Sequence, residues 1–139
     1  MAPKTDETRD MDRPDYLFVY GTLRRGTAIP AQHALERLST FSGTGTFRGV
    51  LYDLGPYPGA CRSRNPKACV RGDLYRVHDP DRLFSFLDAY EGRLFRRERV
   101  TVRSATGARV RAWIYLYRGP LRGEAIIEGG DYLAHLARC

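Results

Sequence analysis

The sequence contains few of the residues that hold metal ions or form disulfides: three cysteines and three histidines among 139 residues. The cysteines, Cys61, Cys69 and Cys139, are odd in number and lack C-x-x-C spacing, which argues against a disulfide framework and against a zinc site. The histidines are scattered, without the H-E-x-x-H spacing that gathers zinc ligands. We therefore predict reduced thiols and no bound metal.

Long hydrophobic runs are also absent. No apolar segment approaches the ~18 residues that indicate a membrane span, and residues 1–15 are polar throughout, unlike a secretory signal. The composition, 42% hydrophobic and 28% charged, is typical of globular proteins. We expect a soluble, cytoplasmic protein with no membrane partner, and the length suits one domain.

Two common catalytic motifs are missing. The stretch Gly21–Thr27 has the glycine spacing of a phosphate loop but lacks the Gly-Lys-Ser/Thr ending that serves phosphate and magnesium. No G-x-S-x-G elbow is present, and no serine has the local signature of an activated nucleophile. These absences argue against a P-loop nucleotide site and against serine hydrolysis.

Charge is unevenly distributed along the chain. Residues 1–15 hold three basic and five acidic side chains, a local charge of −2. Since the whole chain has a formal net charge of +7, the remainder carries +9. A basic domain attracts anions, and solvated arginines explain the charge better than nucleic-acid binding does. An anionic small molecule fits equally well. The nucleic-acid hypothesis rests on the arginines of one predicted hairpin, Arg96, Arg97, Arg99, Arg103, Arg109 and Arg111.

Hydrophobic periodicity predicts an α+β chain. The expected elements are strands at 17–20, 44–54 (with a glycine-induced bulge) and 70–77, helices at 30–38, 80–91 and 132–136, and a hairpin of strands 97–103 and 109–117. Residues 55–59 and 61–69 are expected to be loops. This order differs from βαβ alternation, and we predict a small mixed β-barrel with flanking helices over residues 16–139, preceded by a disordered tail at residues 1–15. We assign the strand aromatics Tyr75, Trp113, Tyr115 and Tyr117 to packing.

The first predicted strand ends abruptly at Tyr20-Gly21-Thr22-Leu23. Gly21 has no Cβ, so the chain can turn sharply and a ligand can approach the main chain closely. Thr22 adds a hydroxyl donor. Free backbone N–H groups at such a strand end suit a carboxylate or a developing oxyanion.

Glu91 lies near the end of the predicted helix at 80–91. A lone glutamate is usually solvated and idle. The helix macrodipole nevertheless disfavours a carboxylate there and raises its pKa. Neighbouring Phe86, Tyr90 and Phe95 would act in the same direction.

Several short motifs together resemble the gamma-glutamylcyclotransferase-like superfamily, in particular its AIG2-like and gamma-glutamylamine cyclotransferase branch. The similarity spans roughly residues 16–118. The resemblance implies a mixed barrel, a substrate cradle at Tyr20, Gly21, Thr22 and Leu23, and an acid–base role for Glu91. The motifs are 18–23 (FVYGTL), 51–52 (LY), 57–58 (YP), 72–75 (GDLY), 87–92 (LDAYEG) and the segment from Arg97 onward.

The resemblance also implies a reaction. In it, the α-amino group of a small gamma-glutamyl amine or peptide attacks its own side-chain carbonyl, which releases 5-oxoproline and a free amine without a cofactor. Many relatives have tyrosine where this chain has Phe95, so that hydroxyl is absent here. The alternative is a non-catalytic member of the fold that binds an anionic metabolite.

Overall fold

The computed structural model describes residues 15–27 and 29–137. The strands are β1 (Asp15–Val19), β2 (Ser39–Asp53), β3 (Pro58–Arg62), β4 (Cys69–Val77), β5 (Phe95–Ser104) and β6 (Arg109–Tyr117). The helices are α2 (Pro30–Leu38), α3 (Pro80–Glu91) and α4 (Tyr132–Ala137), with a short 3-10 turn, η1 (Glu128–Gly130). Among these helices, none is long and apolar enough to cross a membrane.

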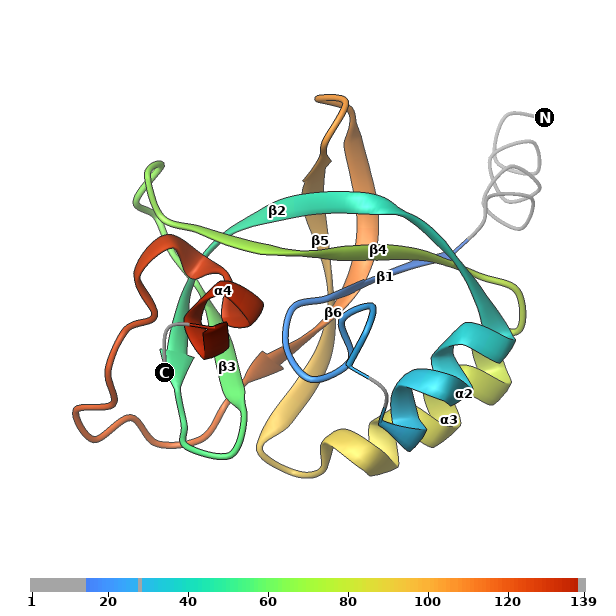
Figure 1. The fold of residues 1–139 in the computed structure, drawn as a ribbon, viewed down its shortest axis with the longest axis horizontal. Helices are drawn as coiled ribbons and strands as arrows, with labels where there is room; N and C mark the ends of the chain where they lie inside the picture. Colours follow the sequence, from blue (N-terminus) through green and yellow to red (C-terminus); the bar gives the residue numbers. More distant parts are fainter. Residues whose placement is uncertain (1–14, 28, 138–139) are drawn as a thin grey trace, which may run out of the picture.

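The strands form a closed mixed barrel, as predicted. They follow the order β3-β2-β4-β1-β6-β5, and a further pairing between β2 and β5 closes the barrel, leaving β3 as an extension beside β2. The pairing of β1 with β6 is parallel, whereas the other pairings are antiparallel. Figure 1 shows β2 as a long arch that curls over the barrel, which lets one strand pair with β3, β4 and β5.

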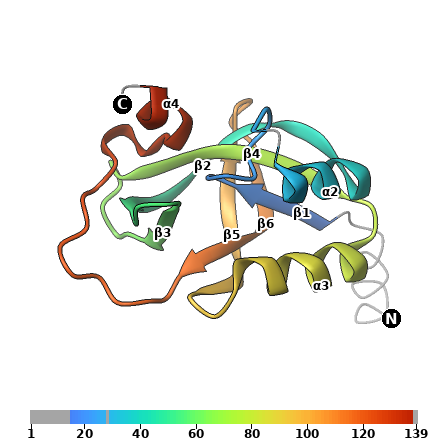
Figure 2. The same ribbon diagram turned by 60° about the horizontal axis from the view of Figure 1, so that its bottom comes forward.

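The apolar run of β1 is buried on both faces, as its lack of alternation predicts. Phe18 packs in the barrel interior, whereas Leu17 and Val19 pack in a second core on the outer face. The second core includes Leu35 of α2 and Leu83 of α3. These two helices lie side by side at one end of the barrel, and α4 lies at the opposite end in both views (Figures 1 and 2).

The helix ends use the residues that the sequence indicates. Asp79 precedes α3 and its side chain accepts a hydrogen bond from the Arg82 N–H at 3.3 Å. Gly92 ends α3 with φ 78°, a left-handed conformation that suits glycine. Asp131 caps α4 by accepting from the Ala134 N–H at 3.2 Å. The three predicted helices are therefore confirmed.

Several predicted strand boundaries differ from the structure. Strand β1 begins at Asp15, one residue inside the predicted tail, and residues 1–14 lie outside the described part of the chain. Strand β2 begins at Ser39 instead of residue 44, and its bulge falls between Phe41 and Gly43, where Gly43 has φ 118°. Its first residues, STFSG, have a turn-like composition but gain ladder partners on β4.

Strand β3 was not predicted at all, because residues 55–59 and 61–69 were expected to be loops. Its Pro58 stands opposite Asp53 at the start of the ladder with β2. Proline is tolerated at the start of a strand or on an edge, where no partner needs its N–H. The loop expected at residues 61–69 is therefore shorter than predicted, because Cys61 lies within β3 and Cys69 is the first residue of β4.

Candidate active site

A cavity of about 380 Å³ opens where β1 ends beside the end of α3. All five residues singled out from the sequence line it: Tyr20, Gly21, Thr22, Leu23 and Glu91. Its other lining residues are Phe18, Val19, Pro56, Tyr57, Pro58, Tyr90, Phe95 and Tyr115. Glu91 is the one carboxylate among these lining residues.

Glu91 is the last residue of α3. Burial raises the pKa of its carboxyl from 4.5 to about 7. None of the described residues donates a hydrogen bond to this carboxyl, so nothing offsets the loss of solvation. Phe86, expected to help, is 44% exposed and lies outside the cavity lining, where it stacks on Tyr90.

Asp88, one helical turn earlier, has the opposite environment. Its carboxylate accepts hydrogen bonds from the Tyr115 hydroxyl (2.6 Å) and from Arg97 (Nε, 2.9 Å; a terminal nitrogen, 3.2 Å). Partial burial raises the pKa of Asp88, but the hydrogen bonds from Arg97 and Tyr115 outweigh it, so the pKa is lowered. Asp88 therefore stays ionised and fixes β5 and β6 against α3, whereas Glu91 is left able to exchange a proton near neutral pH.

Tyr20 positions the first wall of the cavity. Its hydroxyl donates to the backbone oxygen of Tyr115 at 2.6 Å and accepts from the Ala60 N–H at 3.2 Å. Burial raises the pKa of this phenol far above its ordinary value. The hydroxyl is therefore neutral and fully engaged, which makes Tyr20 a link between β1, β3 and β6.

The turn after Tyr20 packs tightly on the start of β3. A Cβ on Gly21 would lie 2.8 Å from Cγ of Pro58, so only glycine fits without movement. The Leu23 side chain packs in the second core with Leu35, and Leu23 also lines the cavity. Within the described part of the chain, the N–H groups of Gly21, Thr22 and Leu23 find no acceptor. Such a row of N–H groups is suited to an anion.

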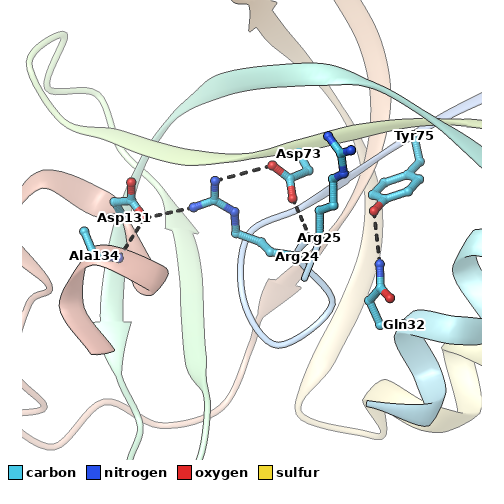
Figure 3. A network of polar contacts seen from close by, with 7 residues as sticks. All are labelled: Arg24, Arg25, Gln32, Asp73, Tyr75, Asp131 and Ala134. Carbon is cyan, nitrogen blue, oxygen red and sulfur yellow. Dashed lines mark hydrogen bonds and ion pairs between the residues drawn. The ribbon is translucent and has the colours of Figure 1, made fainter. Parts of the chain in front are cut away.

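A largely buried ionic network holds this turn in place (Figure 3). The Arg24 guanidinium donates to Asp73 Oδ1 at 3.3 Å and to Asp131 Oδ1 at 2.9 Å. The second oxygen of Asp73 accepts from the Arg25 N–H at 2.7 Å. Asp73 on β4 and Asp131 before α4 thus clamp the loop, and sequence reasoning missed all three charged partners. GDLY was noted as a motif, but nothing local showed that its aspartate binds Arg24.

Aromatic rings form the rest of the cavity wall. The Phe95 ring makes edge contacts with Tyr57 (5.7 Å between centroids) and Tyr117 (5.6 Å). Our assignment of Tyr115 to packing is incomplete, because its ring lines the cavity and its hydroxyl binds Asp88. Tyr75 does serve in packing: it is fully buried, and its hydroxyl accepts from Gln32 of α2 at 3.2 Å (Figure 3).

Comparisons with known proteins agree with this architecture. The family model described as "Gamma-glutamyl cyclotransferase, AIG2-like" matches residues 17–134. The chain is 31% identical over 117 residues to the gamma-glutamylcyclotransferase family protein YtfP of Escherichia coli K12, covering 84% of this chain and 95% of that protein. It is 33% identical over 118 residues to a putative gamma-glutamylcyclotransferase of Vibrio cholerae, covering 84% and 93%.

A solved structure shares the fold. The crystal structure of an AIG2-like protein from Mus musculus superposes with a TM-score of 0.64 at 24% identity, covering 86% of this chain and 95% of that one.

In the described residues of this chain, no group of three or more histidine, cysteine, aspartate or glutamate side chains could hold a metal ion.

Proposed function

The chain belongs to the AIG2-like gamma-glutamylcyclotransferase family, and we propose that it cyclises a gamma-glutamyl amine or peptide to 5-oxoproline and a free amine. One observation carries the proposal. An unpartnered carboxyl with a pKa of about 7 lines the same small cavity as the turn at residues 21–23, whose N–H groups find no acceptor among the described residues.

Glu91 acts as the base in this reaction. The α-amino group of the substrate has a pKa near 8 and is mostly protonated at pH 7. An ordinary glutamate, with a pKa near 4.3, accepts its proton poorly. A carboxyl with a pKa of about 7 is much better matched. Deprotonation frees the nitrogen lone pair, which attacks the side-chain carbonyl carbon and forms the five-membered ring.

The same carboxyl then acts as the acid. As the tetrahedral intermediate collapses, its oxyanion reforms the carbonyl, the bond from that carbon to the leaving nitrogen breaks, and protonated Glu91 gives its proton to that nitrogen. The ring nitrogen gives its second proton to the released amine, which departs as an ammonium ion. Glu91 is thereby ionised again and ready for the next substrate. One residue therefore serves both half-steps, with no group consumed.

The turn at residues 21–23 binds negative charge in this scheme. Its N–H groups hold either the substrate α-carboxylate or the oxyanion of the intermediate. A well-aimed donor to a developing oxyanion is worth about 3 kcal/mol in other enzymes. Holding the substrate folded back on itself supplies a further advantage, because the reacting atoms start in contact.

The aromatic wall faces the leaving group. The rings of Tyr57, Tyr90 and Phe95 line the cavity, so the departing amine meets aromatic side chains instead of a second carboxylate. Phe95 offers no hydroxyl there. Glu91 therefore stays available to protonate the leaving nitrogen.

The test is a panel of gamma-glutamyl amines and dipeptides, incubated with the protein and assayed for 5-oxoproline by mass spectrometry. We expect release by the wild type and none by Glu91→Gln, which keeps the shape but cannot take a proton. Glu128→Gln, an exposed acid in η1 outside the cavity, is the matched control and should be fully active.

Unchanged turnover by Glu91→Gln would refute the mechanism. Binding of panel members by the wild type without any turnover would favour the non-catalytic alternative, a member of the fold that binds an anionic metabolite.

A further inference from the structure

A second cavity, of about 750 Å³, lies along the part of the β5–β6 hairpin that is nearest its turn. Its walls come from β2, from the end of β3, the start of β4 and the connection between them, and from β5 and β6. We call it the basic groove. Of the described residues that line it, none is acidic, and seven are exposed arginines: Arg48, Arg62, Arg64, Arg99, Arg103, Arg109 and Arg111.

The positions of these arginines oppose the usual rules of sheet stability. Arg103 and Arg109 stand directly opposite each other on β5 and β6. Like charges in directly opposed positions destabilise a strand pair. Arg48, Arg62 and Arg64 bring further positive charge from the other wall. Arginines from separate segments of the chain therefore gather around one cavity, which chance scatter over a solvated surface does not require.

Some of this charge is already balanced, but only at the edge. Arg62 pairs with Glu98 at 2.8 Å, and Arg99 pairs with Asp15 at 3.5 Å. Arg48, Arg64 and Arg109 make no hydrogen bond or ion pair with any described residue. Their guanidinium donors are therefore available to a ligand.

The lining chemistry identifies the class of ligand. Guanidinium forks match the oxygens of phosphate groups in a bidentate way. Three hydroxyls stand among them, from Thr46, Ser63 and Thr101. We propose that the basic groove binds a compact anion that carries several phosphate groups.

A nucleic-acid chain fits this groove less well. No described helix lines it, so nothing there can enter a major groove to read bases. Among the described residues that line it, Phe47 is the one aromatic residue, and at 4% exposure it offers no stacking platform for unpaired bases. A recessed hollow with charged walls on both sides suits a small polyphosphate.

The experiment uses inorganic triphosphate as the probe, titrated into the full-length protein by calorimetry. The test variant replaces Arg48, Arg64 and Arg109 by glutamine, which breaks no contact seen among the described residues. Binding should weaken by about tenfold for each guanidinium lost. The control variant replaces Arg37, Arg76 and Arg82 by glutamine, so it loses the same total charge. These three arginines are exposed and lie outside the groove. The control should bind like the wild type.

Two further measurements separate the possible outcomes. Thermal denaturation without triphosphate should show the test variant at least as stable as the wild type, because it relieves repulsion. Triphosphate should raise the melting temperature of the wild type and of the control variant, but hardly that of the test variant. Glu91→Gln should bind triphosphate normally, so failure of the proposed cyclotransferase would leave this result intact. Equal binding by test and control variants would overturn the proposal, as would a 20-nucleotide single strand that binds far more tightly than triphosphate.

Discussion

Replacing Glu91 by glutamine changes how the free energy of unfolding depends on pH. Glu91 has a pKa of about 7 in the folded protein and an ordinary pKa of 4.5 once unfolded. The folded state therefore holds a proton that the unfolded state has lost between these values. Wild-type stability from this group is complete below pH 4.5 and falls as the pH rises to about 7. Above that value both states are ionised and the loss is constant.

The magnitude follows from the same two values. Each pH unit between them is worth about 1.4 kcal/mol, so the interval from 4.5 to about 7 corresponds to about 3 kcal/mol. Glutamine does not titrate, so Glu91→Gln lacks this loss. The stability of the variant relative to the wild type should therefore rise by about 3 kcal/mol between pH 4 and pH 8.

Urea denaturation of both proteins at intervals from pH 4 to pH 8 measures this difference directly. Any constant effect of the amide cancels, because only the change with pH is read. Asp88→Asn serves as a flat control: the folded pKa of Asp88 is lowered from 3.8, so the stability tied to this group is lost only as the pH falls below that value, outside the range measured. A Glu91→Gln difference that stays flat across the range would refute the burial of this carboxyl.

Three further substitutions test the structure around the cavity. Gly21→Ala places a Cβ 2.8 Å from Cγ of Pro58; we expect a loss of about 1–3 kcal/mol in thermal denaturation, restored by adding Pro58→Ala, and no loss in the single variant would contradict the close packing. Arg24→Met leaves Asp73, whose side chain is 5% exposed, without its ion partner; urea unfolding should show a loss of about 3 kcal/mol, and the milder Asp131→Asn should lose less because Asp131 is 29% exposed. Tyr115→Phe removes the hydrogen bond to Asp88; carbon-13 NMR titration should show a raised Asp88 pKa and stability should fall by about 1 kcal/mol, whereas an unmoved titration would exclude this contact.

The sequence predicted the elements whose signals are local. Strand β1 is predicted by its short apolar run. Helix α3 is predicted by its hydrophobic spacing together with the capping residues Asp79 and Gly92. The strand patterning predicted a small mixed barrel and the family resemblance implied the same fold, but no local pattern showed that β2 meets β5 to close it.

The missed features depend on contacts between distant segments. Strand β3 contains proline and glycine, which are typical of a loop, and becomes a strand only because β2 offers it a ladder. The partners of Arg24 lie 49 and 107 residues away, at Asp73 and Asp131. Neither pairing leaves a periodic signal in the chain.

The candidate site shows the same division. The turn at residues 20–23 and Glu91 could be singled out because each has an unusual local setting. Tyr115 could not, because alternating aromatics on a strand look alike whether they pack in a core or line a cavity. The sequence indicates one wall of the basic groove, as the arginines of a predicted hairpin. The opposite wall, from β2 and the β3–β4 connection, forms only when the chain folds.

The central claim is that Glu91 is the base for ring closure, and the pH dependence of kcat/KM for 5-oxoproline release tests it most directly. The rate should rise with pH through about 7, as Glu91 ionises, and fall again as the substrate α-amino group loses its proton near pH 8. A rate that is already maximal at pH 5 would show that no carboxyl with a raised pKa takes part.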